Sequence, residues 1–156
     1  MPRSGADLAL LLLAGYRTLV EATMLELASQ GFEDFRPSHE FAMRAIGAGA
    51  DSASDVARRT SVSKQAAAKT LAVLIERGYV SREADPDDAR RKRLGVTPLG
   101  HDLLRRGEAV FEDLRTQWER TIGAAELAAL ESRLRTLVGD RAVDPTMPGP
   151  AAGELG

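Results

Sequence analysis

The sequence contains no cysteine and few aromatic residues. Without cysteine the chain can form no disulfide framework, thiolate zinc site or thiol redox switch, and a reducing cytoplasmic setting is the natural one. Aromatic residues make up only 4% of the chain, so its core has to be built from Leu, Val and Ala. With 156 residues, 44% of them hydrophobic, the sequence suits one compact domain or one protomer of an oligomer.

Histidine is also scarce, and this limits the chemistry that the chain can perform. The two histidines, His39 and His101, both lie in segments with helical spacing. Neither belongs to a Ser/His/Asp pattern, a metal-ligand spacing or a glycine-rich phosphate loop. We expect His39 to serve as a cap, core or pocket residue and His101 to face solvent. The sequence therefore predicts a protein that is not an enzyme and that holds no metal and no cofactor.

The chain has one marked apolar run, LALLLLAG at 8–15, which resembles the core of a signal peptide. Asp7 precedes this run, and Arg17, Glu21 and Glu26 continue it in a helical pattern. The run is shorter than the roughly 20 apolar residues of a membrane-spanning helix, and no small-residue cleavage site follows it cleanly. The sequence therefore predicts a soluble, cytoplasmic protein with no membrane partner.

Positive charge is concentrated in one part of an acidic chain. The net charge is −2, yet residues 56–96 hold ten Lys or Arg against five Asp or Glu, which leaves −7 for the remainder. A basic island on an acidic scaffold is typical of a surface that binds a polyanion such as nucleic acid. An ordinary solvated surface is the alternative.

The spacing of apolar residues predicts a mainly helical, α+β protein with one short hairpin. We expect helices at 7–30, from 37 to the GAGA run at 47–50, and at 52–60, 64–77, 98–122 and 124–138. We expect strands at 79–84 and 93–97, around the turn sequence DPDD at 85–88. On the second helix the predicted inner face consists of Phe41, Ala42, Ala45 and Ile46.

The segment 52–97 has the order of a winged helix-turn-helix. Only a few residues separate the helix at 52–60 from the helix at 64–77, which is the spacing of a helix-turn-helix. The hairpin follows the second helix directly, in the position of a wing. Such a second helix enters the major groove of a duplex, which is about 12 Å wide, usually with its N-terminal end.

The helix at 64–77 divides into an apolar side and a polar side. The residues predicted to face inward are Val62, Ala67, Leu71, Leu74 and Ile75. Those predicted to face outward are Ser63, Lys64, Gln65, Ala66, Ala68 and Lys69. A simple solvated face is the alternative for the two lysines.

The chemistry of the outward residues assigns each a role on DNA. Gln65 can bind adenine through a donor and an acceptor, and Lys69 can donate to guanine. Ala66 is small enough for a close approach to a thymine methyl. Ser63, Lys64 and Thr70 are better placed for phosphate, helped by the helix N-terminus.

The predicted wing carries four adjacent cations in the sequence DDARRKR: Arg90, Arg91, Lys92 and Arg93. A narrow minor groove attracts inserted arginine, so this cluster is a second predicted DNA contact. Asp88 precedes the cluster, and we expect it to structure the hairpin by bonding to Arg90 or to backbone amides of the turn. A charged edge strand that resists aggregation is the alternative for single members of the cluster.

These features resemble the MarR family, the multiple-antibiotic-resistance-type regulators. The resemblance is close over 35–100 and extends by the pattern of helices to 138. Its strongest part is LIERGYVSREADPDDARRKRLGVTPLG, which is similar to the family's wing and the start of its long helix. The matching landmarks are Leu74, Gly78, Arg82, Asp85, Pro86, Asp88, Arg90, Thr97 and Gly100. Ala89, Gly95 and Pro98 depart from the usual pattern.

The resemblance implies a homodimeric transcription regulator, commonly a repressor, that binds double-stranded pseudo-palindromic DNA. It implies a single winged-helix protomer at 1–139, with dimerisation helices at 7–31 and 98–138 and a DNA-binding lobe at 37–97. Residues 140–156, rich in Pro and Gly, are expected to form a disordered tail. A winged helix that binds another protein and no DNA is the alternative.

The resemblance also implies a small aromatic or amphipathic effector that releases the DNA. Its pocket is expected between the first, second and fifth helices, with Tyr16, Phe35 and His39 as candidate walls. Ordinary core positions are the alternative for these three residues.

Overall fold

The computed structural model describes residues 4–139, and over these residues it contains six helices and one antiparallel hairpin. The elements are α1 (Gly5–Ser29), α2 (Pro37–Gly47), α3 (Ala53–Thr60), α4 (Lys64–Glu76), β1 (Val80–Ala84), β2 (Lys92–Val96), α5 (Pro98–Ile122) and α6 (Ala124–Val138). This order confirms the predicted mainly α fold. The tail at 140–156, for which disorder is expected, lies outside the described residues.

Local caps explain why the helices begin where the sequence predicts. The side-chain oxygens of Ser52, Ser63 and Thr97 each accept a hydrogen bond from the backbone N–H three residues later, at 3.2, 3.0 and 3.1 Å. At the start of α1 a capping box of Ser4 and Asp7 begins the helix at Gly5, two residues earlier than expected.

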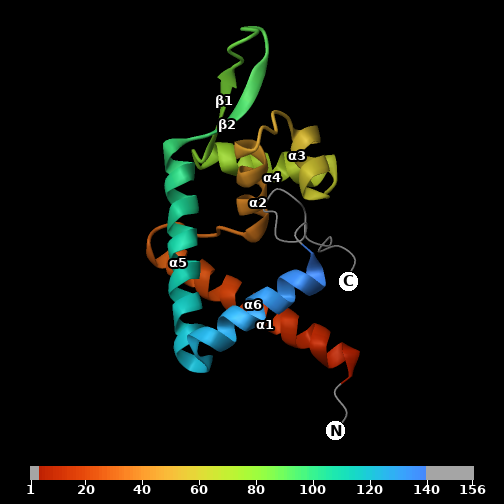
Figure 1. Ribbon diagram of the computed structural model, residues 1–156. Helices are drawn as coiled ribbons and strands as arrows, with labels where there is room; N and C mark the ends of the chain where they lie inside the picture. Colours follow the sequence, from red (N-terminus) through yellow and green to blue (C-terminus); the bar gives the residue numbers. More distant parts are fainter. Residues whose placement is uncertain (1–3, 140–156) are drawn as a thin grey trace.

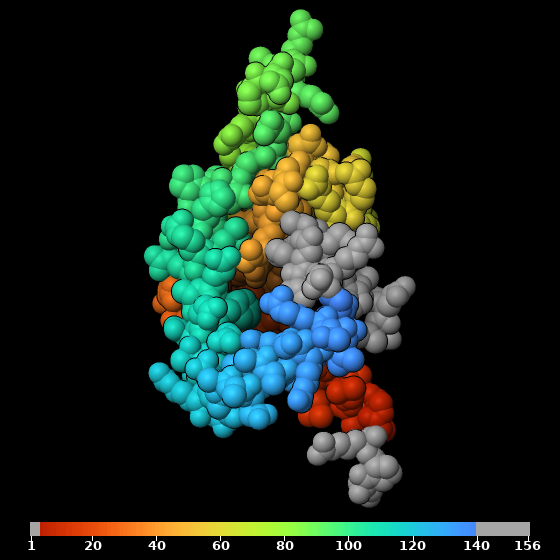
Figure 2. Space-filling model, viewed as in Figure 1, coloured from red at the N-terminus to blue at the C-terminus, as the bar shows by residue number. Residues whose placement is uncertain are grey.

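The elements form two regions joined by one long helix (Figure 1). α5 runs along the side of the molecule, with the hairpin at one end and the turn into α6 at the other. α2, α3 and α4 lie beside the hairpin end of α5, and α1 and α6 each pack against α5 farther from the hairpin. The hairpin projects clear of the body in the space-filling view (Figure 2).

The main core lies where α2, α3, α4 and the hairpin meet α5. Its fully buried side chains include Met43, Val56, Leu71, Leu74, Val80 and Leu103. Two predictions of inward residues are wrong here. Phe41 is 39% exposed because it lies on the flank of α2, while Met43 takes the central position. Val62 is 44% exposed because it precedes the N-cap of α4 and does not follow the helical period.

A close backbone contact sets the hairpin against α5. The Thr97 hydroxyl donates to the carbonyl of Gly78 at 2.5 Å. The backbone N–H of Thr97 donates to the carbonyl of Tyr79 at 3.0 Å. A Cβ added at Gly100 would overlap the Tyr79 carbonyl oxygen and lie 2.8 Å from Cγ1 of Val96. A side chain at position 100 would therefore push the first turn of α5 away from the base of the wing.

By length and composition alone, α1 is apolar enough to cross a membrane, with a mean hydropathy of 1.5 over its most apolar 18-residue stretch. This finding differs from the expectation drawn from the short run at 8–15. Thr23 and Leu27, in the second half of α1, are buried, and α1 packs against α5. In the first half, by contrast, Leu10 and Leu11 are 63% and 67% exposed in the single chain. Part of α1 therefore presents leucines that nothing in the described chain covers.

Candidate nucleic-acid interface

The turn between α3 and α4 is fixed by the backbone. Ser61 has a left-handed φ of 51°, and the N–H of Val62 donates to the carbonyl of Ala57 at 3.1 Å. This pattern ends α3 in a Schellman-type turn, after which Ser63 starts α4. The two helices pack against each other, so the sequence spacing indeed produces a helix-turn-helix.

α4 has a buried side and an exposed side. Ala67, Leu71 and Leu74 are buried and Ile75 is half-buried. The exposed residues of its first two turns are Ser63, Lys64, Gln65, Ala66, Ala68 and Lys69. Thr70, the remaining predicted phosphate contact, is half-buried at the edge between the two sides.

Three polar side chains on the exposed side of α4, those of Lys64, Gln65 and Lys69, are free to bind a ligand. Within residues 4–139, no carboxylate lies within 4.0 Å of Lys64 or Lys69, and the Gln65 side chain has no hydrogen-bond partner. The first turn of α4 holds no acidic residue. The positive end of the helix dipole and the lysine charges therefore act together at this end.

At the C-terminal end of α4 the charge of the exposed side changes from positive to negative. Glu76 is exposed and lies eleven residues after Gln65, which places it on the same helix face as Gln65 and Lys69. A carboxylate on this face repels phosphate. The charge pattern thus confines the anion-binding part of α4 to its first turns, a limit that is not evident from the positive residues alone.

The wing is a regular hairpin whose loop is held by two aspartates. Its register pairs Val80 with Val96 and Ala84 with Lys92. The carboxylate of Asp88 accepts a hydrogen bond from the backbone N–H of Arg90 at 3.0 Å. We expect Asp88 to bond to Arg90 or to backbone amides of the turn, and its observed partner is the backbone amide of Arg90.

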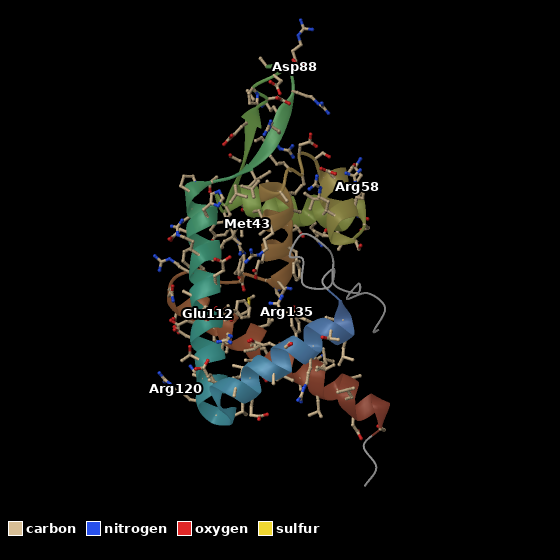
Figure 3. All side chains as sticks on the ribbon, viewed as in Figure 1. Met43, Arg58, Asp88, Glu112, Arg120 and Arg135 are labelled. Atoms are coloured by element: carbon tan, nitrogen blue, oxygen red, sulfur yellow. The ribbon has the colours of Figure 1, made fainter. Side chains whose placement is uncertain are left out.

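Asp85 completes the loop, a role that the sequence reading did not assign to it. Its N–H donates to the carbonyl of Arg91 at 2.8 Å, and its carboxylate accepts the N–H of Asp87 at 2.9 Å. The DPDD turn sequence was the signal for this arrangement. Figure 3 labels Asp88 at the end of the projecting hairpin, far from Glu112 and Arg120 on the opposite part of α5.

The four wing cations are not equivalent. A guanidinium nitrogen of Arg93 lies 3.8 Å from the carboxylate of Asp85. Arg90, Arg91 and Lys92 are exposed, and among the described residues no carboxylate lies within 4.0 Å of them. The charge available to an external anion therefore resides mainly in these three residues, at the end of the wing.

The departures from the family pattern have local explanations at two positions. A Cβ at Gly95 would lie 3.3 Å from the carboxylate of Glu83, whose side chain folds across the hairpin and accepts a bond from Ser81. Pro98 occupies the first position of α5, where its missing N–H costs nothing. Ala89 lies exposed in the wing loop.

The three predicted effector walls differ in how far they are buried. Phe35 and His39 are buried, with ring centroids 5.8 Å apart. Nδ1 of His39 accepts the N–H of Arg36 at 3.2 Å, so His39 caps α2 from the core. Burial, Arg77 and Arg36 hold the pKa of His39 below its ordinary value. Tyr16 is half exposed, and burial together with Glu40 raises the pKa of its hydroxyl.

An open cavity of about 330 Å³, closer to a surface depression than to an enclosed pocket, lies between α2, β2 and α5. Its lining residues are Met43, Arg44, Gly47, Ala48, Val96, His101 and Leu104. Arg44 bridges the two helices, 2.9 Å from Glu40 of α2 and 3.1 Å from Glu108 of α5. No pattern in the sequence indicates this bridge, because Glu108 lies 64 residues away on another helix. His101, expected to face solvent, is exposed at the rim.

Residues 4–139 contain no group of three or more His, Asp or Glu side chains placed to hold a metal ion. The two histidines lie on different helices, one as a buried cap and one exposed.

Comparisons with known proteins agree with this geometry. A sequence model described as MarR family matches residues 41–91. A search of curated proteins found no significant match. Wild-type MarR of E. coli in its apo form aligns with a TM-score of 0.65 at 20% identity, over 85% of this chain and 97% of that chain.

Two further structures carry ligands. The Mycobacterium tuberculosis MarR family protein Rv2887, in complex with salicylic acid, aligns with a TM-score of 0.63 at 23% identity, over 86% of this chain and 96% of that chain. A MepR mutant of S. aureus bound to an oligodeoxyribonucleotide aligns with a TM-score of 0.58 at 15% identity, over 83% and 94%. The chain thus combines a MarR family sequence at 41–91 with the fold of MarR family structures, and the resemblance predicted from its sequence is confirmed.

Proposed function

We propose that this protein is a DNA-binding transcription regulator of the MarR type that acts as a homodimer and represses by occupying its operator. The observation that carries the proposal is the placement of free positive charge. The chain is acidic overall, yet it places cations on α4 and at the end of the wing. Lys64 and Lys69, like the three wing-end cations, have no acidic partner among the described residues. Charge so placed fits a duplex and has no evident structural use.

Each part of this surface has a role on DNA. The first turns of α4 enter the major groove, where Gln65 reads adenine and Lys69 reads guanine. Ser63, Lys64 and Thr70 bind phosphate beside the helix N-terminus. On the wing, Arg90, Arg91 and Lys92 enter the adjacent minor groove, while Arg93 chiefly supports the hairpin. The MepR complex with an oligonucleotide supports this use of the shared fold.

The dimer is proposed from the apolar surface at the other end of the molecule. Leu10 and Leu11 of α1 and Leu137 of α6, the last 79% exposed, leave an apolar surface that a second copy would bury. This also accounts for the membrane-like composition of α1 without a membrane. Pairing through α1, α5 and α6 leaves both lobes at 37–97 free to bind two half-sites, in the cytoplasm where the DNA would be.

The cavity between α2, β2 and α5 is a proposed effector site, and the walls predicted from the sequence, Tyr16, Phe35 and His39, are the alternative. An aromatic acid fits its chemistry, because Met43 and Leu104 supply apolar walls and Arg44 supplies a cation. A bound carboxylate would compete with Glu108 for Arg44 and so weaken the link between α2 and α5. The salicylic acid complex of Rv2887 supports this class of ligand.

Salt dependence of DNA binding tests the function and separates it from a protein-binding winged helix. We expect log K for a duplex to fall with log salt at a slope of about −0.9 for each phosphate neutralised. Arg90→Ala should weaken binding to selected and to random duplex alike, with an unchanged melting temperature. A flat salt dependence would argue for the protein-binding alternative. Wild-type affinity in Arg90→Ala would argue against the wing assignment.

A further inference from the structure

Val62 is an exposed apolar side chain at the leading end of the DNA-reading helix. Among the described residues of α3, α4 and the turn between them, no other large apolar side chain is classed as exposed. Val62 directly precedes Ser63, the N-cap of α4, and is followed in sequence by the exposed Lys64 and Gln65. Val62 therefore lies beside the end of α4 that the proposed function places in the major groove.

The position of Val62 is set before any ligand arrives. Its N–H is bonded to the carbonyl of Ala57, and the left-handed Ser61 precedes it. Its own side chain is branched at Cβ, which restricts χ1 to few rotamers. Little conformational entropy is therefore lost when its methyl groups pack against a partner.

Local structure explains only part of this residue. An apolar residue that follows a left-handed helix end commonly packs back onto the helix, here toward Val56 and Ala57. Such packing would cover part of the Val62 side chain. It gives no reason for the 44% of this branched apolar side chain that stays exposed.

We propose that Val62 is a specificity-determining residue that packs on the C5 methyl group of a thymine in each half-site. The thymine methyl is the one apolar group that base edges present in the major groove. Cytosine has no such methyl, so the contact favours an A·T pair at one defined position. This inference rests on the proposed function, since it requires that α4 enters the major groove.

Removal of single methyl groups from the DNA tests the contact without altering the protein. The probe is the duplex that the wild-type protein selects from a random pool, with each thymine replaced in turn by deoxyuridine. We expect one position in each half-site to lose affinity about three- to fivefold, the effect of one buried methyl. In Val62→Ala the same replacement should cost little, whereas Gln65→Ala should retain the full loss at that position.

The outcomes separate the two proposals. If a duplex is selected but no uracil replacement weakens binding, the Val62 contact is wrong and the DNA-binding function stands. The contact is equally wrong if Val62→Ala, with an unchanged circular dichroism melt, stays as sensitive to uracil as the wild type. If no duplex is selected at all, the proposed function itself fails.

Discussion

At the scale of single residues, His39 serves both as a helix cap and as a core residue. Its Nδ1 accepts the N–H of Arg36, and its ring lies in the core beside Phe35. Protonation of Nδ1 would replace this acceptor with a donor and place a positive charge near Arg36 and Arg77. The folded state therefore favours neutral His39.

This preference predicts a loss of stability in mild acid. The pKa of His39 is lower in the folded state than its ordinary value of 6.5, so the contribution is complete above pH 6.5 and is lost as pH falls through the lowered pKa. The urea midpoint of the wild type should fall between pH 7 and pH 5. In His39→Gln, whose amide oxygen can accept the same bond without titrating, it should fall less.

The range from pH 7 to pH 5 is chosen to avoid the titration of two carboxyl groups whose pKa values are shifted. Arg106 lowers the pKa of Asp102 and Arg115 lowers that of Glu131, from ordinary values of 3.8 and 4.5, so both groups titrate below the chosen range. Both carboxylates are present in the variant and in the wild type. Equal decline of the two proteins between pH 7 and pH 5 would show that His39 is not the group responsible.

At the scale of elements, the wing illustrates how neighbouring like charges acquire different roles. Arg93 lies on β2 beside Asp85, whereas Arg91 lies in the loop with no carboxylate nearby among the described residues. The Arg93–Asp85 pair is half exposed, so its loss should change stability by only about 0–1 kcal/mol. The difference between the two arginines should therefore appear in DNA binding rather than in folding.

Arg91→Ala and Arg93→Ala form a matched pair for this test. Arg91→Ala should reduce the salt slope of duplex binding by about 0.9, the loss of one phosphate contact. Arg93→Ala should leave the slope close to that of the wild type, since this side chain is partly neutralised by Asp85. An equal reduction in both variants, measured by fluorescence anisotropy with a labelled duplex, would contradict the assignment.

The sequence predicts elements well where local chemistry decides them. Ser52, Ser63 and Thr97 mark three helix starts through their own caps, and Pro98 follows the last of these. It predicts less well where packing decides. Nothing in the helical period distinguishes Phe41 from Met43 as the core residue of α2, and the turn residue Val62 has no period to follow.

The candidate site divides in the same way. The outward face of α4 follows from helical spacing, because Ala67, Leu71 and Leu74 recur on one side. The division of the wing cations does not follow, because it depends on which arginine reaches Asp85 across the hairpin. The cavity beside Arg44 also could not be predicted, since it depends on how α2, β2 and α5 meet in space.

At the scale of the whole molecule, the basic surface of α4 and the wing lies apart from the exposed leucines of α1 and α6. The hairpin and α4 lie at one end of α5, and α6 follows its other end (Figure 1). The clustered cations Lys64, Lys69, Arg90, Arg91 and Lys92 lie at the first end, and the exposed leucines of α1 and α6 lie toward the second. In a dimer formed through the apolar end, two reading helices would be held at a fixed separation by α5.

In vitro selection of bound duplexes, with the stoichiometry of the selected complex, tests this account most directly. We expect enriched sequences to contain two inverted half-sites whose centers lie about one helical turn apart, roughly 34 Å, bound by two copies of the chain. Enrichment of a single unsymmetric site occupied by one copy would contradict the dimeric arrangement. No enrichment at low ionic strength would contradict DNA recognition itself.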